Sequence, residues 1–320
     1  MARLLDQVFG HKDLISKMLQ AFSGERPGQT FLFVGPSGIG KKKIAIGFAQ
    51  ALLCEKTRTA CGSCPGCLRV AAGAHESLKI VLPTGSQIKI DDSRDIIEFL
   101  SLQSLTPRRV VIIDQAQLLN LQAANSLLKT LEEPPAETYF FLLAPSAAGL
   151  LPTLRSRSRT VGFKPLKSEE IRRGATEAPE WAVRACQGSF EKLAQLLDVS
   201  EIEIRGQAFL VLQQFFEDKE FLTENTWRDI FKERQRSQRI FSYWISFLRD
   251  VLYYQEGQKK SILNVDQGDL LKMISEQKRS RLLDFLEKIM RVELEVGQNR
   301  DVQLMIEELW VHEQDRGKEI

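Results

Sequence analysis

One short stretch has the residue types and spacing of a phosphate-binding loop. GPSGIGKK at residues 35–42 follows the pattern G-x-x-x-x-G-K-[ST] except at its last position, where Lys42 replaces Ser or Thr. The glycines let backbone N–H groups face an anion, and a helix that begins there adds partial positive charge. Lys41 is placed to reach the β and γ phosphates, but the hydroxyl that would hold Mg²⁺ is missing. The stretch predicts a site of nucleotide-binding origin and leaves open whether ATP and magnesium still bind.

The second half of such a site is an acid that ends a core strand, and VVIID supplies Asp114. This carboxylate is suited to hold Mg²⁺ directly or through a water. Gln115 follows, where ring ATPases of this architecture have a Glu that polarises the attacking water, and an amide has no charge with which to draw off a proton. Lys42 and Gln115 together indicate a site that has lost the ability to hydrolyse ATP. The predicted nucleotide-site residues are Gly35, Pro36, Ser37, Gly38, Ile39, Gly40, Lys41, Lys42 and Asp114.

Four of the five cysteines fall in the run CEKTRTACGSCPGC at residues 54–67. Two C-x₂-C steps stand back to back, a spacing that suits thiolates converging on one tetrahedral ion. Free thiols on a loop are the alternative, but the Gly and Pro between the cysteines favour tight metal-binding turns. Four protein ligands leave no open coordination position, so a structural zinc is predicted. Its predicted ligands are Cys54, Cys61, Cys64 and Cys67.

The pattern of apolar residues divides the chain into an α/β part and an all-α part. Over residues 1–165, strand-sized apolar runs at 31–35, 78–83, 109–114 and 138–145 alternate with helical patterns. This alternation predicts a parallel sheet covered on both faces. Residues 166–205 are expected to form a small helical module, and the remainder to residue 320 is helical with no strand signal.

Composition and charge are those of an ordinary globular protein. Hydrophobic residues make up 43% and charged residues 27% of the chain, and the net charge of +2 gives no general attraction to nucleic acid. The amino-terminal MARLLDQVFGHKD carries an acid and lacks the long apolar core of a signal peptide. The longest apolar runs are far shorter than a membrane span. We therefore expect a cytoplasmic protein with no membrane partner.

NSLLKTLEEPPAETYFFLLA, followed by LLPTLRSRSR, resembles the clamp-loader subunits of bacterial DNA polymerase III, and the delta-prime subunits among them most of all. The cysteine run, the DDSRDIIEFL helix and the ending GQNRDVQLMIEELW share this resemblance, which is dense over residues 28–163 and thin beyond 200. It implies an AAA+ type domain at 1–165 with a zinc module at 54–67. It also implies a helical lid at 166–205 and a helical collar at 206–320 that closes a five-subunit ring. The gap of six residues between Cys54 and Cys61 is short for the family.

The resemblance implies a stator, that is, a subunit that supports the ring without an ATPase activity of its own. As a non-catalytic subunit of the polymerase holoenzyme it would help the ATP-dependent loading of the sliding clamp onto primed DNA. Its implied partners are the delta and gamma/tau subunits and, through the complex, the clamp and primer-template DNA. An active gamma/tau-like ATPase is the alternative. A zinc-containing nucleic-acid-binding module is a third reading, which the lack of aromatics among the cysteine turns does not favour.

Two further positions follow from the resemblance. The family's S-R-C signature appears here as Ser156-Arg157-Ser158, so Arg157 matches the arginine finger that acts in trans on a neighbouring ATP site. A solvated basic face, formed with Arg155 and Arg159, is the alternative. In the lid, the motor subunits place an Arg sensor after a Gly-Ser pair. Here the corresponding segment leads to Glu191, an acid that would repel phosphate.

Overall fold

The structure is a computed structural model, and it describes residues 3–22, 28–102, 106–217, 221–223, 226–296, 298 and 300–316. The chain divides into two compact units. The first, the α/β unit, comprises residues 1–177 with 187–191, and the second, the helical unit, comprises residues 178–186 with 192–320. The finer division into a domain, a lid and a collar remains a prediction.

A parallel five-stranded sheet forms the centre of the α/β unit, in the order β2-β3-β4-β1-β5. The strands are β1 (Gln29–Val34), β2 (Leu78–Val81), β3 (Arg109–Ile113), β4 (Thr138–Ala144) and β5 (Arg159–Gly162). Every neighbouring pair is parallel, and Val34 lies opposite both Ala144 and Gly162. The ends of β1 and β3 therefore lie at one edge of the sheet, which places the phosphate loop near Asp114. The AAA+ type parallel sheet implied by the resemblance is confirmed.

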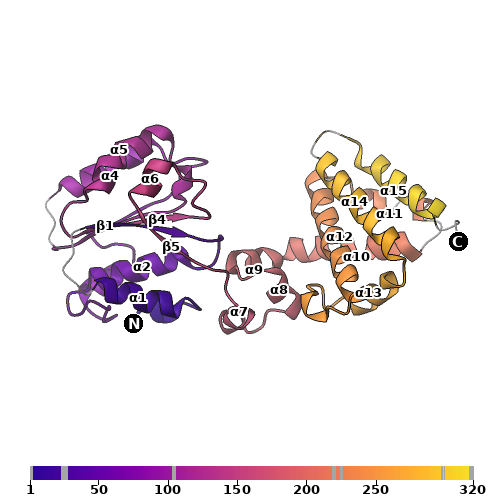
Figure 1. Cartoon of the computed structure of the whole chain (residues 1–320), viewed down its shortest axis with the longest axis horizontal. Coiled ribbons are helices and arrows are strands. Elements are labelled where there is room, and N and C mark those ends of the chain that lie inside the picture. Colours follow the sequence, from indigo (N-terminus) through magenta and orange to yellow (C-terminus); the bar gives the residue numbers. More distant parts are fainter. Residues whose placement is uncertain are drawn as a thin grey trace. The chain divides into compact units, whose positions relative to one another are not determined.

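Helices cover both faces of this sheet (Figure 1). Phe31 and Phe33 of β1 pack into one core with Phe48, whereas Leu32 packs into the other with Leu127, as alternation along a strand requires. On the first face lie α1 (Lys12–Phe22) and α2 (Lys41–Leu52). On the second face lie α4 (Ile90–Ser101), α5 (Leu121–Glu132) and α6 (Pro152–Ser156). The unit also contains η1 (Leu4–Gln7), α3 (Pro65–Ala71), η2 (Ala116–Leu118) and α7 (Ser168–Gly174).

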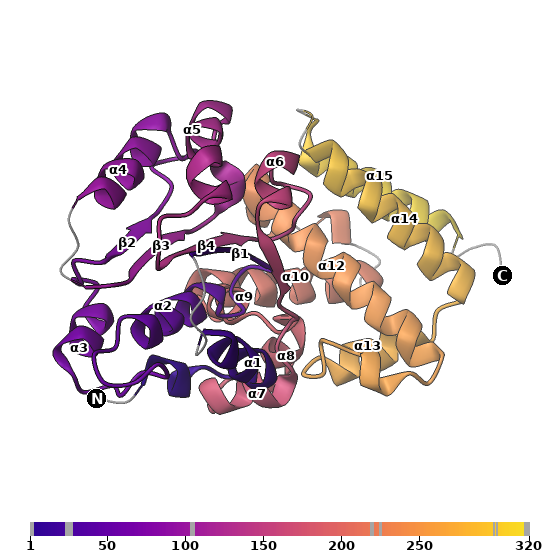
Figure 2. The same cartoon turned by 60° about the vertical axis from the view of Figure 1, so that its left-hand side comes forward.

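The helical unit packs around α12 (Arg234–Gln255), which contacts α10 (Val199–Glu217), α13 (Gly268–Ser275) and α14 (Arg279–Val296) (Figure 2). Phe241, Trp244 and Leu248 of α12 are fully buried in this core. The unit's remaining elements are α8 (Glu180–Ala185), η3 (Phe221–Thr223), α11 (Thr226–Ile230), η4 (Lys259–Ser261) and α15 (Val302–Arg316). Helix α9 (Phe190–Leu196) begins in the α/β unit and ends in the helical unit. The predicted α/β plus all-α architecture is confirmed.

Among the residues that the structure describes, no helix combines the length and the apolar character that a membrane crossing needs.

Candidate functional site

The phosphate loop connects β1 to α2 and depends on glycine for its path. Gly38 and Gly40 have φ angles of 72° and 96°, in the left-handed region that glycine adopts without strain. A Cβ on Gly38 would lie 2.3 Å from Ser189 Oγ and 2.4 Å from Glu191 Cβ. The backbone N–H of Phe190 also donates to the Gly38 carbonyl over 2.9 Å. The segment around Glu191 therefore lies directly against the loop, where the resemblance placed it.

Lys41 begins α2 and folds back over the loop. Its Nζ donates to the carbonyl oxygens of Gly35 and Pro36 over 2.5 and 2.6 Å. Burial lowers the pKa of Lys41, and the negative charges of Asp114 and Glu191 oppose this shift. The ammonium therefore lies inside the loop, close to the acids of the site.

Lys42 forms an ion pair with Asp114, with 3.2 Å between Lys42 Nζ and Asp114 Oδ2. The side chains are 43% and 21% exposed, so both remain accessible from solvent. The other oxygen of Asp114 accepts a hydrogen bond of 3.0 Å from the backbone N–H of Gln115. Magnesium requires a compact octahedral set of oxygen ligands. The residues present do not fit it, because Lys42 offers no hydroxyl and its ammonium lies beside the carboxylate.

A cavity of about 740 Å³ opens over this loop. Its lining includes Lys41, Lys42, Lys43, Asp114 and Glu191. Gln115 and Gln117 also contribute, and Gln115 has a φ of 52°. Lys41 and Lys42 offset the charges of the two carboxylates, and the N–H groups of the loop and the start of α2 add the partial positive charge that favours an anion.

The four clustered cysteines converge as predicted. Their sulfur atoms all lie within 4.8 Å of one another, and Cys54–Cys64 and Cys61–Cys67 are each 3.9 Å apart between Sγ atoms. A tetrahedron of Zn–S bonds of about 2.3 Å has S–S edges of roughly 3.8 Å. The short gap before Cys61 therefore does not prevent Cys54 from joining the cluster. The residues fit a tetrahedral metal ion.

Backbone N–H groups point at these sulfur atoms. The N–H groups of Thr57, Cys64 and Cys67 lie 3.3, 3.3 and 3.4 Å from the Sγ atoms of Cys54, Cys61 and Cys64, respectively. Hydrogen bonds from the backbone of Ser63 and Cys64 lower the pKa of Cys61 to about 5, whereas burial raises the pKa of Cys67 to about 12. The backbone donors favour thiolates, which are the form that ligates a metal. The second C-x₂-C step is the start of α3, capped by Cys64, where the sequence predicted only turns.

Gln50 is a site residue that the sequence analysis missed. It is 1% exposed, and its amide accepts from the Leu4 N–H over 2.9 Å and donates to the Cys67 carbonyl over 3.1 Å. It therefore joins the amino-terminal segment, α2 and the cysteine cluster. A polar residue among the apolar positions of the 41–53 helix was the available signal.

Arg157 lies directly after α6 and is held by its own chain. Its Nε donates to Glu132 Oε2 over 2.9 Å, and its Nη1 to the Thr153 carbonyl over 3.2 Å. The side chain is 30% exposed. Within the described residues Arg155 and Arg159 are exposed and form no ion pair, so Arg157 differs in setting from the neighbouring arginines.

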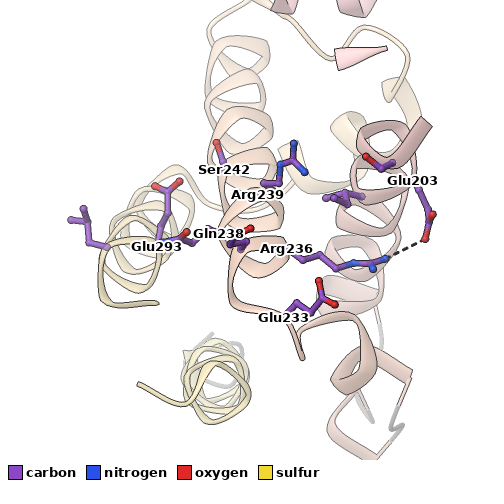
Figure 3. A pocket seen from close by; sticks show the side chains of 11 residues that line it. Glu203, Glu233, Arg236, Gln238, Arg239, Ser242 and Glu293 are labelled. Carbon is purple, nitrogen blue, oxygen red and sulfur yellow. Dashed lines mark hydrogen bonds and ion pairs between the residues drawn. The ribbon is translucent and has the colours of Figure 1, made fainter. Parts of the chain in front are cut away.

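A second cavity, of about 930 Å³, lies in the helical unit between α10, α12 and α14 (Figure 3). Arg236 points from α12 toward Glu203 of α10 and pairs with it over 3.2 Å, and Arg239 pairs with Glu201 over 2.5 Å. These arginines are already neutralised. The cavity therefore does not favour an anion, and its lining also includes the carboxylates of Glu203, Glu233 and Glu293.

Two family descriptions match the sequence in succession. Residues 10–167 match the family described as "DNA polymerase III, delta subunit", and residues 205–312 match "DNA polymerase III, delta subunit, C terminal". A solved structure, a DNA polymerase III gamma subunit-related protein from Thermotoga maritima, has 19% identity and a TM-score of 0.45. That alignment covers 94% of this chain and 99% of the other.

Similar curated proteins include several subunits of bacterial DNA polymerase III. DNA polymerase III subunit delta' of Pseudomonas aeruginosa is 36% identical over 53% of this chain, and the chain spans 52% of that protein's length. Subunit delta' of Bacillus subtilis is 29% identical over 76% of this chain and 77% of its own length. The tau subunit of Escherichia coli is 33% identical over 52% of this chain, but only 26% of tau is matched. With both family matches in succession, the chain belongs to the delta-prime family of DNA polymerase III clamp-loader subunits.

Proposed function

We propose that this protein is a stator subunit of a DNA polymerase III clamp loader and does not hydrolyse ATP itself. The ion pair between Lys42 and Asp114 carries this proposal, because it replaces the hydroxyl and the magnesium that hydrolysis needs. Gln115 and Glu191 support it, since neither can polarise water or sense a phosphate as the motor residues do.

The proposed partners are the other clamp-loader subunits, delta and gamma/tau, in a ring of five. Through this ring the protein would support the loading of the sliding clamp onto primer-template DNA in the cytoplasm. Membership of the delta-prime family and the partial matches to tau support this assignment. The proposed parts are the AAA+ type domain at 1–165, the lid at 166–205 and the collar at 206–320.

Arg157 is the proposed arginine finger. A planar, permanently charged guanidinium suits the neutralisation of charge that develops on a γ-phosphate in the adjoining subunit. Its partial exposure and its distinct ion pair with Glu132 support this assignment over a generic basic surface.

Zinc is the proposed ion of the cysteine cluster, with a structural role. The convergence of four thiols and the two buried members, Cys64 and Cys67, support a closed site with no position for a reactive water.

Turnover of Mg-ATP by the purified chain tests the central claim. We expect the rate to stay at background. A steady rate that Lys41→Ala abolishes would instead establish the gamma/tau-like ATPase. Co-purification with the tagged chain tests the complex, since recovery of polymerase III loader subunits is expected. Salt-sensitive DNA binding by the isolated chain without those subunits would favour the nucleic-acid-binding module.

A further inference from the structure

The phosphate-loop cavity contains its own cation at the place where a metal is needed. In working nucleotide sites of this design, magnesium bridges a strand-end carboxylate and the phosphate oxygens. Here Lys42 Nζ lies 3.2 Å from Asp114 Oδ2, and both residues line the cavity of about 740 Å³. An ammonium has three N–H donors, so an ion pair with one carboxylate leaves donors for a phosphate oxygen.

We propose that this cavity binds the phosphate chain of a nucleotide as the metal-free anion, with Lys42 in the place of magnesium. The inference rests on the proposed function, in which the site no longer hydrolyses ATP. The proposed function requires only that hydrolysis is lost. The inference goes further, because it names a ligand class, a di- or triphosphate, and a metal-free mode of binding.

The other groups of the loop are arranged for an anion. Gly38 and Gly40 hold the left-handed turns that expose backbone N–H groups, and α2 begins at the next residue, Lys41. Lys41 now donates to two loop carbonyls, bonds that a phosphate oxygen can replace. Glu191 opposes binding, but Lys41 and Lys42 offset the charges of Glu191 and Asp114, and the N–H groups of the loop and the start of α2 add partial positive charge.

A divalent ion would bind only weakly in the same place. It would lie beside the positive charge of Lys42 and would lack the hydroxyl ligand. Excess magnesium also converts free ATP into its complex, which has less charge for the lysines to attract. The affinity of this chain for ATP should therefore fall, not rise, when magnesium is added.

Isothermal titration of the full chain with ATP, ADP and pyrophosphate tests the inference, in EDTA and in excess Mg²⁺. We expect binding in EDTA and weaker apparent binding in Mg²⁺. Pyrophosphate binding would show that the phosphates suffice, and binding of ATP and ADP alone would show that the nucleoside contributes.

Lys42→Ala should weaken ATP binding in EDTA by about tenfold or more, since it removes a charged hydrogen-bond donor. Lys43→Ala is the matched control, because Lys43 lines the same cavity but donates to the Gln7 carbonyl over 3.1 Å. That change should have an effect of about threefold at most. Lys42→Thr restores the hydroxyl and should reverse the preference toward Mg-ATP.

The inference is overturned if the wild-type chain binds none of the three probes in EDTA, or binds them only with Mg²⁺. Equal losses from Lys42→Ala and Lys43→Ala would also overturn it, since they would indicate general charge attraction. The titrations of the wild-type chain do not depend on the folding of any variant. A chain that binds no phosphate but still supports its complex leaves the stator function standing, whereas turnover of Mg-ATP by the chain alone would overturn both.

Discussion

The guanidinium of Arg157 and the carboxylate of Glu132 form an ion pair of 2.9 Å between the residue that follows α6 and the end of α5. The pair fixes the direction of an arginine that otherwise has several rotatable bonds. Within the part of the chain that the structure describes, its contacts engage Nε and Nη1, which leaves the Nη2 side of the guanidinium for a neighbouring anion.

Arg157→Ala should lower ATP hydrolysis by the reconstituted clamp-loader complex while the chain still folds and assembles. The ion pair is partly exposed, so its loss should cost at most about 1 kcal/mol of unfolding free energy. Removal of a finger in trans can reduce turnover by about 10³ at a single site, but other sites in the ring keep theirs, so the total loss should be partial. Arg159→Ala is the control. Equal effects of the two changes, or failed assembly with Arg157→Ala, would contradict the finger assignment.

Glu132→Ala should reduce the turnover number of the complex with little change in its KM for ATP, because it removes the group that positions Arg157. The loss should be smaller than that from Arg157→Ala, since the guanidinium remains. Glu133→Ala removes an adjacent exposed acid and should leave turnover unchanged. A rise in activity with Glu132→Ala would instead mean that the ion pair restrains the finger.

Cys64→Ser should reduce bound zinc from about one per chain and destabilise the α/β unit by about 3 kcal/mol or more. Cys64 is 1% exposed, and its sulfur lies in the cluster. Metal analysis and urea unfolding of the purified protein provide the measurements. Cys186→Ser is the control, because Cys186 is buried in the helical unit and is not one of the four clustered cysteines. A metal-free wild-type protein of undiminished stability would refute the structural zinc.

His75 should make the protein less stable as the pH falls. Burial lowers the pKa of His75 below its ordinary value of 6.5, against the opposing charge of Glu76. The unfolded chain binds the proton more tightly than the folded chain does. The stabilisation from neutral His75 is therefore complete above the pKa of the unfolded state, and it is lost as the pH falls through that value toward the pKa of the folded state. Nδ1 accepts from the Ser77 N–H over 3.1 Å, and His75→Asn can keep that acceptor.

Urea unfolding between about pH 7.5 and about pH 5.5 measures this effect. Protonation of zinc-ligating thiolates acts in the same direction, so the difference between wild type and His75→Asn is the informative quantity. The variant should show a shallower pH dependence. Identical slopes would exclude His75 as the cause.

The core of the fold could be predicted from the sequence because its central strands β1, β3 and β4 are largely buried on both faces. The runs at 31–35, 78–83, 109–114 and 138–145 correspond to β1–β4, within two residues at each end. β5 was not predicted, since its residues RTVG are largely exposed and pair on one side with β1 alone. Apolar periodicity carries no signal for such an edge strand.

The site could be predicted as a set of residues but not as a set of contacts. The loop followed from its motif, Asp114 from its position at the end of a strand, and the cysteines from their spacing. The direction of the Lys42 side chain and the pairing of Arg157 with Glu132 depend on rotamers that folding selects, and sequence spacing does not encode them.

Helix α2 has the phosphate loop at one end and the cysteine cluster at the other, where Gln50 bonds to Cys67. Its 12 residues span roughly 18 Å. This is about twice the Debye length of roughly 8 Å at physiological ionic strength. The partly exposed lysines of the loop are therefore largely screened from the charge of a metal-thiolate centre, and α2 itself is the physical connection between the two sites. Metal occupancy and phosphate affinity should accordingly show little thermodynamic linkage as long as α2 stays folded.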